Sequence, residues 1–435
     1  MFAYYIQLGL RSLRRNPVLT ALMVLGIGLG IAASMTTLTV MHLMGADPIP
    51  WKSDKLHYVQ LDNWDVNNSY YDDSNRPPDQ VTYRDAQALM AAGKADKQAA
   101  MWKIALPIQP ENPEVKPFTS LGRVTYADFF PMFEPPFAYG GPWDRKQDDE
   151  HARVIVLTKD TNEKLFGGQD SVGKTVRMDG VDYTVVGVLG HWKLRARYYD
   201  LTNGAFADPE EFFMPFTTAI DLKKRGSGNN SCFKTPGDGW EAYLASDCVW
   251  MQMWVQLDSP ARLAEYKSFL DNYVNEQKKL GRFERPLNNR LLDVNQWMKD
   301  QKVVSRDVEV QTGLGFAFLA VCLVNTIGLL LAKFTRKSGE IGLRRALGAS
   351  RREVFTQFLV ESGVVGLSGG LVGLLLTGLG LLAVRALYST YKSVASLDVS
   401  MVLVTIALAV ISAVLAGLYP TWRACRVQPA AQLKI

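Results

Sequence analysis

The stretch KFTRKSGEIGLRRALGASRREVFTQFLVES (Lys333–Ser362) is decisive for the fold because its basic first part lies between two long apolar runs. Its first 20 residues carry seven basic side chains against one acid, Glu340. The basic residues are Lys333, Arg336, Lys337, Arg344, Arg345, Arg351 and Arg352. Basic residues accumulate at the cytoplasmic ends of membrane-spanning helices. We therefore expect residues 333–357 to form a cytoplasmic loop between two spans.

Four apolar runs surround this loop, and each reaches the roughly 20 residues that a helix needs to cross about 30 Å of hydrocarbon. They predict transmembrane helices at residues 17–44, 313–332, 358–384 and 399–419. Two of the runs contain a glutamate or several threonines near an end, which a helical bundle tolerates. The first run is longer than the roughly 7–15 apolar residues of a signal peptide, so we expect it to stay in the protein.

The distribution of charge predicts the orientation in the membrane. No acid precedes Asp47, three arginines precede the first run, and basic residues without acids follow the fourth. We therefore expect both termini (1–16 and 420–435) inside, and residues 45–312 and the short connection 385–398 outside. Residues 45–312 carry a net charge of −6 and the rest of the chain +11, which gives the overall +5. Because the basic surplus lies beside the membrane, it does not support nucleic-acid binding.

Two features of the membrane segments concern packing. Residues 1–16 have an amphipathic pattern, which fits either a helix in the membrane interface or the frayed start of the first span. The first and third spans are rich in small residues, which let helices approach closely. These glycines are Gly26, Gly28, Gly30, Gly366, Gly369, Gly370 and Gly373. They favour a tightly packed bundle or a dimer.

The large insertion, residues 45–312, alternates strand and helix patterns, which predicts an α+β domain. Its stretch Gly168–Thr175 (GQDSVGKT) matches a nucleotide-binding pattern. A phosphate-binding loop follows a strand and opens a helix. Here a helix-like run precedes the glycines, and a hairpin with an Asp179-Gly180 turn follows. We therefore predict that this stretch binds no nucleotide and that its glycines shape a turn.

The cysteines and histidines of the insertion carry little sign of catalysis. Cys232 and Cys248 close a loop that predicts a disulfide worth about 3 kcal/mol in an oxidising compartment, two unpaired buried thiols being the alternative. His57, His151 and His191 are scattered without metal-ligand spacing. The many carboxylates have no nucleophile motif nearby, so we interpret them as solvated surface and expect no enzymatic activity and no bound metal.

The cytoplasmic loop itself predicts a short helix. Ser338 is positioned to cap it, Glu340 and Arg344 are spaced as an i,i+4 pair, and Gly348 ends it. Ser350 and Glu353 then form a capping box that starts the next helix. The apolar side chains of the short helix form a compact surface that we expect to pack against another protein. These side chains are Ile341, Leu343, Ala346 and Leu347.

At these residues the chain resembles the FtsX/MacB-type permeases of ABC transporters. The motif TRKSGEIGLRRALGASRREVFTQFLVES carries the resemblance most specifically, and LGIGLGIAAS, VTYADFFPMF and EEFFMPFTT extend it. The resemblance implies a four-span subunit in the bacterial inner membrane with a MacB-like periplasmic core domain. It also implies a coupling helix that docks in a cleft of an ATPase. The residues it assigns there are Glu340, Ile341, Gly342, Leu343, Arg344, Arg345, Ala346, Leu347, Gly348 and Ala349.

The resemblance implies a function as well. Such permeases convert ATP hydrolysis into a shape change of the outer domain, called mechanotransmission, and many serve export or efflux. MacB carries a fused ATPase that we do not find in this sequence, so we expect a separate ATPase subunit to bind ATP and magnesium. This chain is then expected to bind no cofactor. Further expected partners are a second permease in a homodimer or heterodimer, a periplasmic adaptor and an outer-membrane channel. The alternative is a membrane-anchored sensor or scaffold that regulates an extracytoplasmic partner such as a cell-wall hydrolase.

Overall fold

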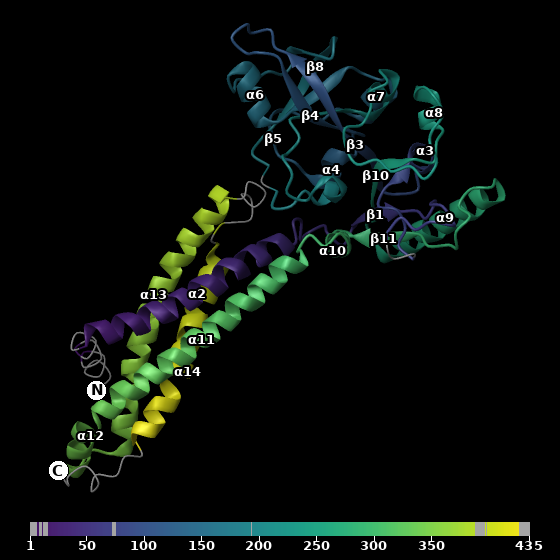
Figure 1. The fold of residues 1–435 in the computed structure, drawn as a ribbon. Coiled ribbons are helices and arrows are strands. Elements are labelled where there is room, and N and C mark those ends of the chain that lie inside the picture. Colours follow the sequence, from purple (N-terminus) through teal and green to yellow (C-terminus); the bar gives the residue numbers. More distant parts are fainter. Residues whose placement is uncertain are drawn as a thin grey trace. The chain divides into compact units, whose positions relative to one another are not determined.

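The chain divides into a helical unit and an inserted unit (Figure 1). The helical unit comprises residues 1–46 and 304–435, and the inserted unit comprises Asp47–Val303. The computed structural model describes residues 7, 11, 16–71, 75–192, 194–387, 396 and 398–425. The predicted N-terminal amphipathic helix, most of the 385–398 connection and the tail after Cys425 lie outside the described residues.

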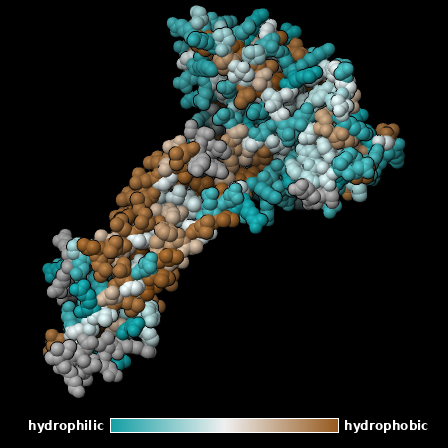
Figure 2. Space-filling model, viewed as in Figure 1, coloured by the Kyte–Doolittle hydropathy of each residue, from teal (hydrophilic) through white to brown (hydrophobic). Residues whose placement is uncertain are grey.

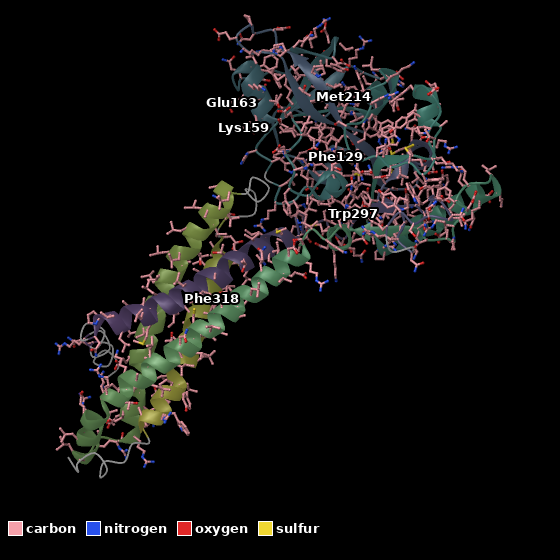
Figure 3. All side chains as sticks on the ribbon, in the orientation of Figure 1. Phe129, Lys159, Glu163, Met214, Trp297 and Phe318 are labelled. Atoms are coloured by element: carbon pink, nitrogen blue, oxygen red, sulfur yellow. A yellow bond between two sulfur atoms is a disulfide. The ribbon has the colours of Figure 1, made fainter. Side chains whose placement is uncertain are left out.

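Within its described residues, the helical unit contains four long helices and one short one. They are α2 (Pro17–Gly45), α11 (Arg306–Arg336), α12 (Ser338–Ala346), α13 (Arg351–Leu387) and α14 (Val399–Cys425). The four long helices are long and apolar enough to cross a membrane, which confirms the four predicted spans. Figure 2 shows hydrophobic side chains over these helices and mainly hydrophilic ones over the inserted unit. Phe318 on α11, labelled in Figure 3, is one of the exposed apolar side chains.

The helices extend beyond the apolar runs that predict them. α11 begins at Arg306, before the apolar run that is predicted to cross the membrane from residue 313. Its first turn carries Asp307 and Glu309, which favour a helix N-terminus through the helix dipole but are invisible to hydropathy. α13 likewise begins at Arg351, before the predicted residue 358.

Glycines allow close helix packing inside the helical unit, as the sequence predicts. A Cβ added to Gly366 or Gly370 on α13 would overlap Ala413 or Ala409 on α14. A Cβ on Gly28 of α2 would lie 2.9 Å from Val372 of α13. Such contacts require the absence of a side chain at these positions.

The inserted unit is an 11-stranded mixed sheet with helices, in the order β11-β1-β10-β3-β4-β9-β6-β8-β5, with β2 on β10 and β7 on β3 and β8. The strands are β1 (Leu56–Gln60), β2 (Val81–Thr82), β3 (Lys97–Gln109), β4 (Phe118–Thr125), β5 (Phe137–Gly140), β6 (Val154–Leu157), β7 (Thr175–Met178), β8 (Val181–Leu189), β9 (Phe212–Pro215), β10 (Val249–Gln256) and β11 (Arg290–Asp293). The helices are α3 (Tyr83–Ala92), α4 (Phe129–Phe133), α5 (Arg145–Asp149), α6 (Lys159–Phe166), η1 (Tyr198–Asn203), α7 (Phe216–Asp221), α8 (Trp240–Leu244), α9 (Pro260–Lys279) and α10 (Val294–Asp300). This arrangement confirms the predicted α+β insertion.

Two hydrophobic cores lie on the two faces of the sheet, because successive side chains of a strand point to opposite sides. On β3, Trp102 and Ile104 belong to one core, whereas Met101 belongs to the other. In the second core, Trp297 on α10 stacks on Tyr58 of β1 with ring centroids 3.8 Å apart. Trp297 is labelled in Figure 3.

The first and last strands of the inserted unit pair with each other. β1 and β11 are antiparallel neighbours, with His57 opposite Asp293 and Gln60 opposite Arg290. The two ends of a segment of 257 residues therefore meet in one ladder.

The Asp179-Gly180 turn joins β7 and β8 as the sequence predicts. Both residues have positive φ angles, 48° and 76°, which is the conformation of the tight hairpin turn that Asp-Gly favours. The predicted order of helix, glycine turn and hairpin is thus confirmed.

Candidate functional site

The candidate site is α12, which follows α11 after a single residue. Lys337 is at once the C-cap of α11 and the N-cap of α12, with φ −93° and ψ 4°. These angles lie close to helical values, so the backbone hydrogen bonds continue across the joint. The N–H of Lys337 donates to the Phe334 carbonyl and the N–H of Ile341 donates to the Lys337 carbonyl.

This continuity explains why the predicted Ser338 cap is wrong. Ser338 is the first residue of α12, and the N-cap position belongs to Lys337, whose side chain makes no capping hydrogen bond. A hydroxyl cap serves N–H groups that lack a carbonyl partner, and here backbone carbonyls at the joint accept from Lys337 and Ile341. The other end has the expected geometry: Gly348 has φ +104°, and the N–H of Ala349 donates to the Arg344 carbonyl at 3.0 Å.

The turn after α12 leads directly into α13. The N–H of Ser350 donates to Glu353 Oε2 at 2.9 Å, and the N–H of Glu353 donates to Ser350 Oγ at 3.2 Å. These are the two reciprocal hydrogen bonds of a capping box. α12 is therefore held between two long helices by connections with defined geometry.

α12 has one buried and one exposed face. Ile341 is 3% exposed and packs in a buried cluster with Phe334 of α11 and Phe358 of α13. The prediction that Ile341 belongs to a free apolar surface is wrong, since its own chain covers it. Leu343 and Leu347, one helical turn apart, are 53% and 80% exposed. Ala346 is also exposed, so the outward face is apolar at three positions.

Polar contacts tie α12 to its neighbours. Arg344 contacts Glu340 at 2.6 Å, as the i,i+4 spacing predicts, and also donates to Gln357 of α13 at 3.0 Å. Arg345 Nη1 donates to the carbonyl of Cys425, the last residue of α14, at 3.4 Å. The exposed Glu340–Arg344 ion pair contributes at most about 1 kcal/mol to stability, so we interpret these contacts as orienting α12.

Beside α12 lies a buried charge cluster that sequence reasoning missed. Lys333 Nζ of α11 is 2.7 Å from Glu361 Oε1 of α13, and their side chains are 1% and 3% exposed. Lys337 Nζ at the joint is 3.3 Å from Glu361 Oε2. The available signal was the glutamate inside an apolar run, since buried charges in membrane helices are paired.

The inserted unit contains a second buried charge cluster. Arg123 donates to Asp200 and Glu210, and all three side chains are at most 1% exposed. Burial alone would raise the pKa of Glu210, but Arg123 and Arg197 outweigh it and hold this pKa at about 2. The interpretation of the carboxylates as solvated surface is therefore wrong for Asp200 and Glu210. The cluster is fully enclosed, so its role is structural.

The inserted unit also contains the predicted disulfide and the predicted glycine-rich turn. Cys232 and Cys248 form a disulfide (Figure 3). The nucleotide-like stretch forms the turn between α6 and β7, where the N–H of Gly173 donates to the Val185 carbonyl and Lys174 Nζ lies over the Phe166 ring. Within the described residues, no group of three or more histidine, cysteine or acidic side chains has metal-site geometry.

Comparisons with known proteins match both units. Residues 20–273 match the model of the MacB-like periplasmic core domain, and residues 312–429 match that of the FtsX-like permease C-terminal domain. The macrolide export ATP-binding/permease protein MacB of Rhodopirellula baltica is 24% identical over 434 residues, which cover 96% of this chain and 60% of the relative. MacB of Chlorobium phaeobacteroides is 24% identical over 298 residues, covering 68% of this chain and 40% of the relative.

Two further similarities concern a permease and a solved structure. The uncharacterized ABC transporter permease YvrN of Bacillus subtilis is 22% identical, covering 71% of this chain and 68% of the relative. The crystal structure of the periplasmic region of MacB from Actinobacillus actinomycetemcomitans is 14% identical, with a TM-score of 0.37, covering 59% of this chain and 96% of that one. The chain thus spans 40% to 60% of the length of the two MacB relatives.

Proposed function

This chain belongs to the MacB/FtsX-like family of ABC transporter permeases, and from that premise we propose that it is the transmembrane subunit that a separate cytoplasmic ATPase drives. In this proposal the ATPase binds ATP and magnesium and docks on α12. Its closure changes the conformation of the inserted unit on the other side of the inner membrane. The work done there is export or efflux by mechanotransmission.

The observation that carries this proposal is the continuity of α11. This helix runs unbroken from Arg306 to Arg336, which at 1.5 Å per residue is about 46 Å. One residue separates its end from α12, and two residues separate its start from Val303, the end of the inserted unit. In this proposal α11 carries a displacement of α12 along its length to the two-residue connection that leads into the inserted unit.

The exposed face of α12 supports the docking role. Leu343 and Leu347 present apolar surface beside the Glu340–Arg344 pair, so a partner cleft can combine apolar burial with charge pairing. Fully burying one leucine contributes about 1.5–3 kcal/mol. The basic residues of 333–352 favour the cytoplasmic side for this face, where an ATPase has access to ATP.

The proposed assembly is a dimer of this chain, or of this chain with a related permease, together with ATPase subunits. An adaptor and an outer-membrane channel can extend the path. Macrolide export is stated in the names of the two MacB relatives.

The test is co-purification of the full chain with candidate ABC ATPases, followed by ATPase measurements in lipid nanodiscs. We expect Leu343→Asp to weaken ATPase binding at least tenfold, and Glu340→Ala to reduce the permease-dependent ATPase rate. Leu280→Asp is the matched control, because Leu280 is 74% exposed in the inserted unit. Equal binding by Leu343→Asp and by the wild type would refute the docking role of α12.

The alternative is a sensor or scaffold that regulates an extracytoplasmic partner without transport. A chain that binds no ABC ATPase, but whose inserted unit retains a hydrolase from the same compartment, would favour this alternative.

A further inference from the structure

We infer that Glu361 clamps the joint between α11 and α12, so that α11, α12 and the start of α13 move as one rigid body. Lys333, Lys337 and Glu361 are then positioning residues for the coupling of α12 to the rest of the protein. This inference rests on the proposed role of α12, and it concerns side chains other than those of the proposed docking face.

The geometry of the clamp is specific. Lys333 and Lys337 are one helical turn apart, and the single carboxylate of Glu361 faces both, at 2.7 Å and 3.3 Å. Lys333 belongs to the last turns of α11, Lys337 is the joint residue, and Glu361 belongs to α13. The Glu361 side chain thus links the end of α11 and the joint residue Lys337 to α13.

A hydrophobic cluster lies beside the three charged residues. In it, the rings of Phe334 and Phe358 have centroids 4.4 Å apart, and Ile341 from α12 packs with them. Lys333 and Glu361 are 1% and 3% exposed, so water screens their attraction only weakly. Without Glu361, Lys333 would remain buried without its carboxylate partner, and Lys337, which is 21% exposed, would repel it from one turn away.

The consequence concerns how displacement passes through the joint. A single-residue connection without side-chain links could bend when α12 is pushed, and the movement would then stop at Lys337. With Glu361 bound to both lysines, bending at Lys337 requires breaking the half-buried Lys337–Glu361 pair or the fully buried Lys333–Glu361 pair. The cluster therefore favours rotation of the three helices together over bending at the joint.

The test is hydrogen–deuterium exchange of the full chain in lipid nanodiscs, which needs no ATPase. We expect Glu361→Gln to raise the exchange rate of the amides in α12 at least tenfold, while exchange in α2 stays within twofold of the wild type. Arg336→Gln is the matched control, because it removes an exposed cation from the same turn of α11. We expect this control to leave exchange in α12 unchanged.

If Glu361→Gln impairs assembly, a variant with the charges reversed keeps the experiment interpretable. The triple variant Lys333→Glu, Lys337→Glu and Glu361→Lys retains both pairs with reversed signs, and we expect it to restore exchange in α12 to within threefold of the wild type. Wild-type exchange rates in Glu361→Gln, or a triple variant no better than the single one, would overturn the inference.

A second arm uses the ATPase complex and separates this inference from the proposed function. We expect Glu361→Gln to bind the ATPase within twofold of wild-type affinity but to lose at least fivefold in coupled ATPase rate. Unaltered coupling would overturn the clamp while leaving the docking role intact. Failure of the wild-type chain to bind any ATPase would refute the proposed function, and the exchange experiment would still decide the clamp.

Discussion

Replacement of Arg123 by methionine is expected to destabilise the inserted unit strongly. Arg123 is fully buried and donates to Asp200 and Glu210 from β4, the strand that runs beside β9. Methionine retains the apolar stem of the side chain but leaves both carboxylates without their shared cation. Breaking a buried ion pair from one side costs about 3–5 kcal/mol.

The remaining contacts of the two carboxylates indicate the lower end of that range. Arg197 Nη1 stays 3.2 Å from Glu210, and Gln252 and Asn203 still donate to Asp200. We therefore expect a loss of about 3 kcal/mol in the free energy of unfolding. For a unit of this size, such a loss lowers the Tm by about 6–12 °C.

The same substitution should change the dependence of stability on pH. The folded-state pKa of Glu210 is about 2, below its ordinary value of 4.5, so its stabilising contribution is present above pH 4.5 and is lost as the pH falls through about 2. Arg123→Met removes most of this contribution. The difference in stability between wild type and variant should therefore be full at pH 7 and should narrow below about pH 4.5.

The assay is thermal unfolding of the full chain in detergent, followed by tryptophan fluorescence, with hydrogen exchange of residues 118–125 as a local readout. Arg177→Met is the control, because Arg177 and Asp182 form an ion pair that is 51% and 57% exposed. We expect the control to change stability by less than about 1 kcal/mol. An Arg123→Met variant with the wild-type Tm, or with a deficit that is the same at pH 4 and pH 7, would refute the reasoning.

Three further predictions concern packing, protonation and the disulfide. Gly370→Leu should separate α13 from α14 at Ala409 and lower the thermal stability of the detergent-solubilised chain by about 1–3 kcal/mol, whereas an unchanged melting curve would contradict the close contact. Burial raises the pKa of Asp148 from 3.8 to about 7, so the stability that its protonated form contributes should be lost as the pH rises from 4 through 7. The Tm of Asp148→Asn should therefore depend less on pH between pH 5 and pH 8 than the Tm of the wild type, and an equal dependence would contradict this reasoning. Cys232→Ser should cost about 3 kcal/mol by freeing Cys248, and a reducing agent should lower the Tm of the wild type but not of the variant.

Hydropathy and turn chemistry predicted most of the fold because both are local signals. The four apolar runs gave four helices, and Asp179-Gly180 gave the hairpin, since each property resides in a few consecutive residues. The ends of the helices were predicted less well. Polar helical turns such as Arg306–Thr312 carry no hydropathy signal, so the apolar run did not indicate that α11 begins at Arg306.

The candidate site was predicted in position but not in detail. The caps and charges of residues 338–353 indicated a short helix, yet Ile341 and Leu343 look alike in sequence, and only the fold decides that one is buried and the other exposed. The Lys333–Glu361 pair joins residues on two different helices, and Arg123 contacts residues 77 and 87 positions away. Contacts of this kind depend on tertiary packing, which no local pattern encodes.

The pairing of β1 with β11 has a consequence for engineering. The first and last strands of the inserted unit are hydrogen-bonded to each other, so cutting the chain on both sides of the unit leaves all of its strand pairing intact. Residues 47–303 can thus be exchanged as a block for the corresponding block of a related permease while the host helices keep their register. Chimeras built in this way would report separately on which unit selects the proposed exported substrate and which unit selects the proposed ATPase.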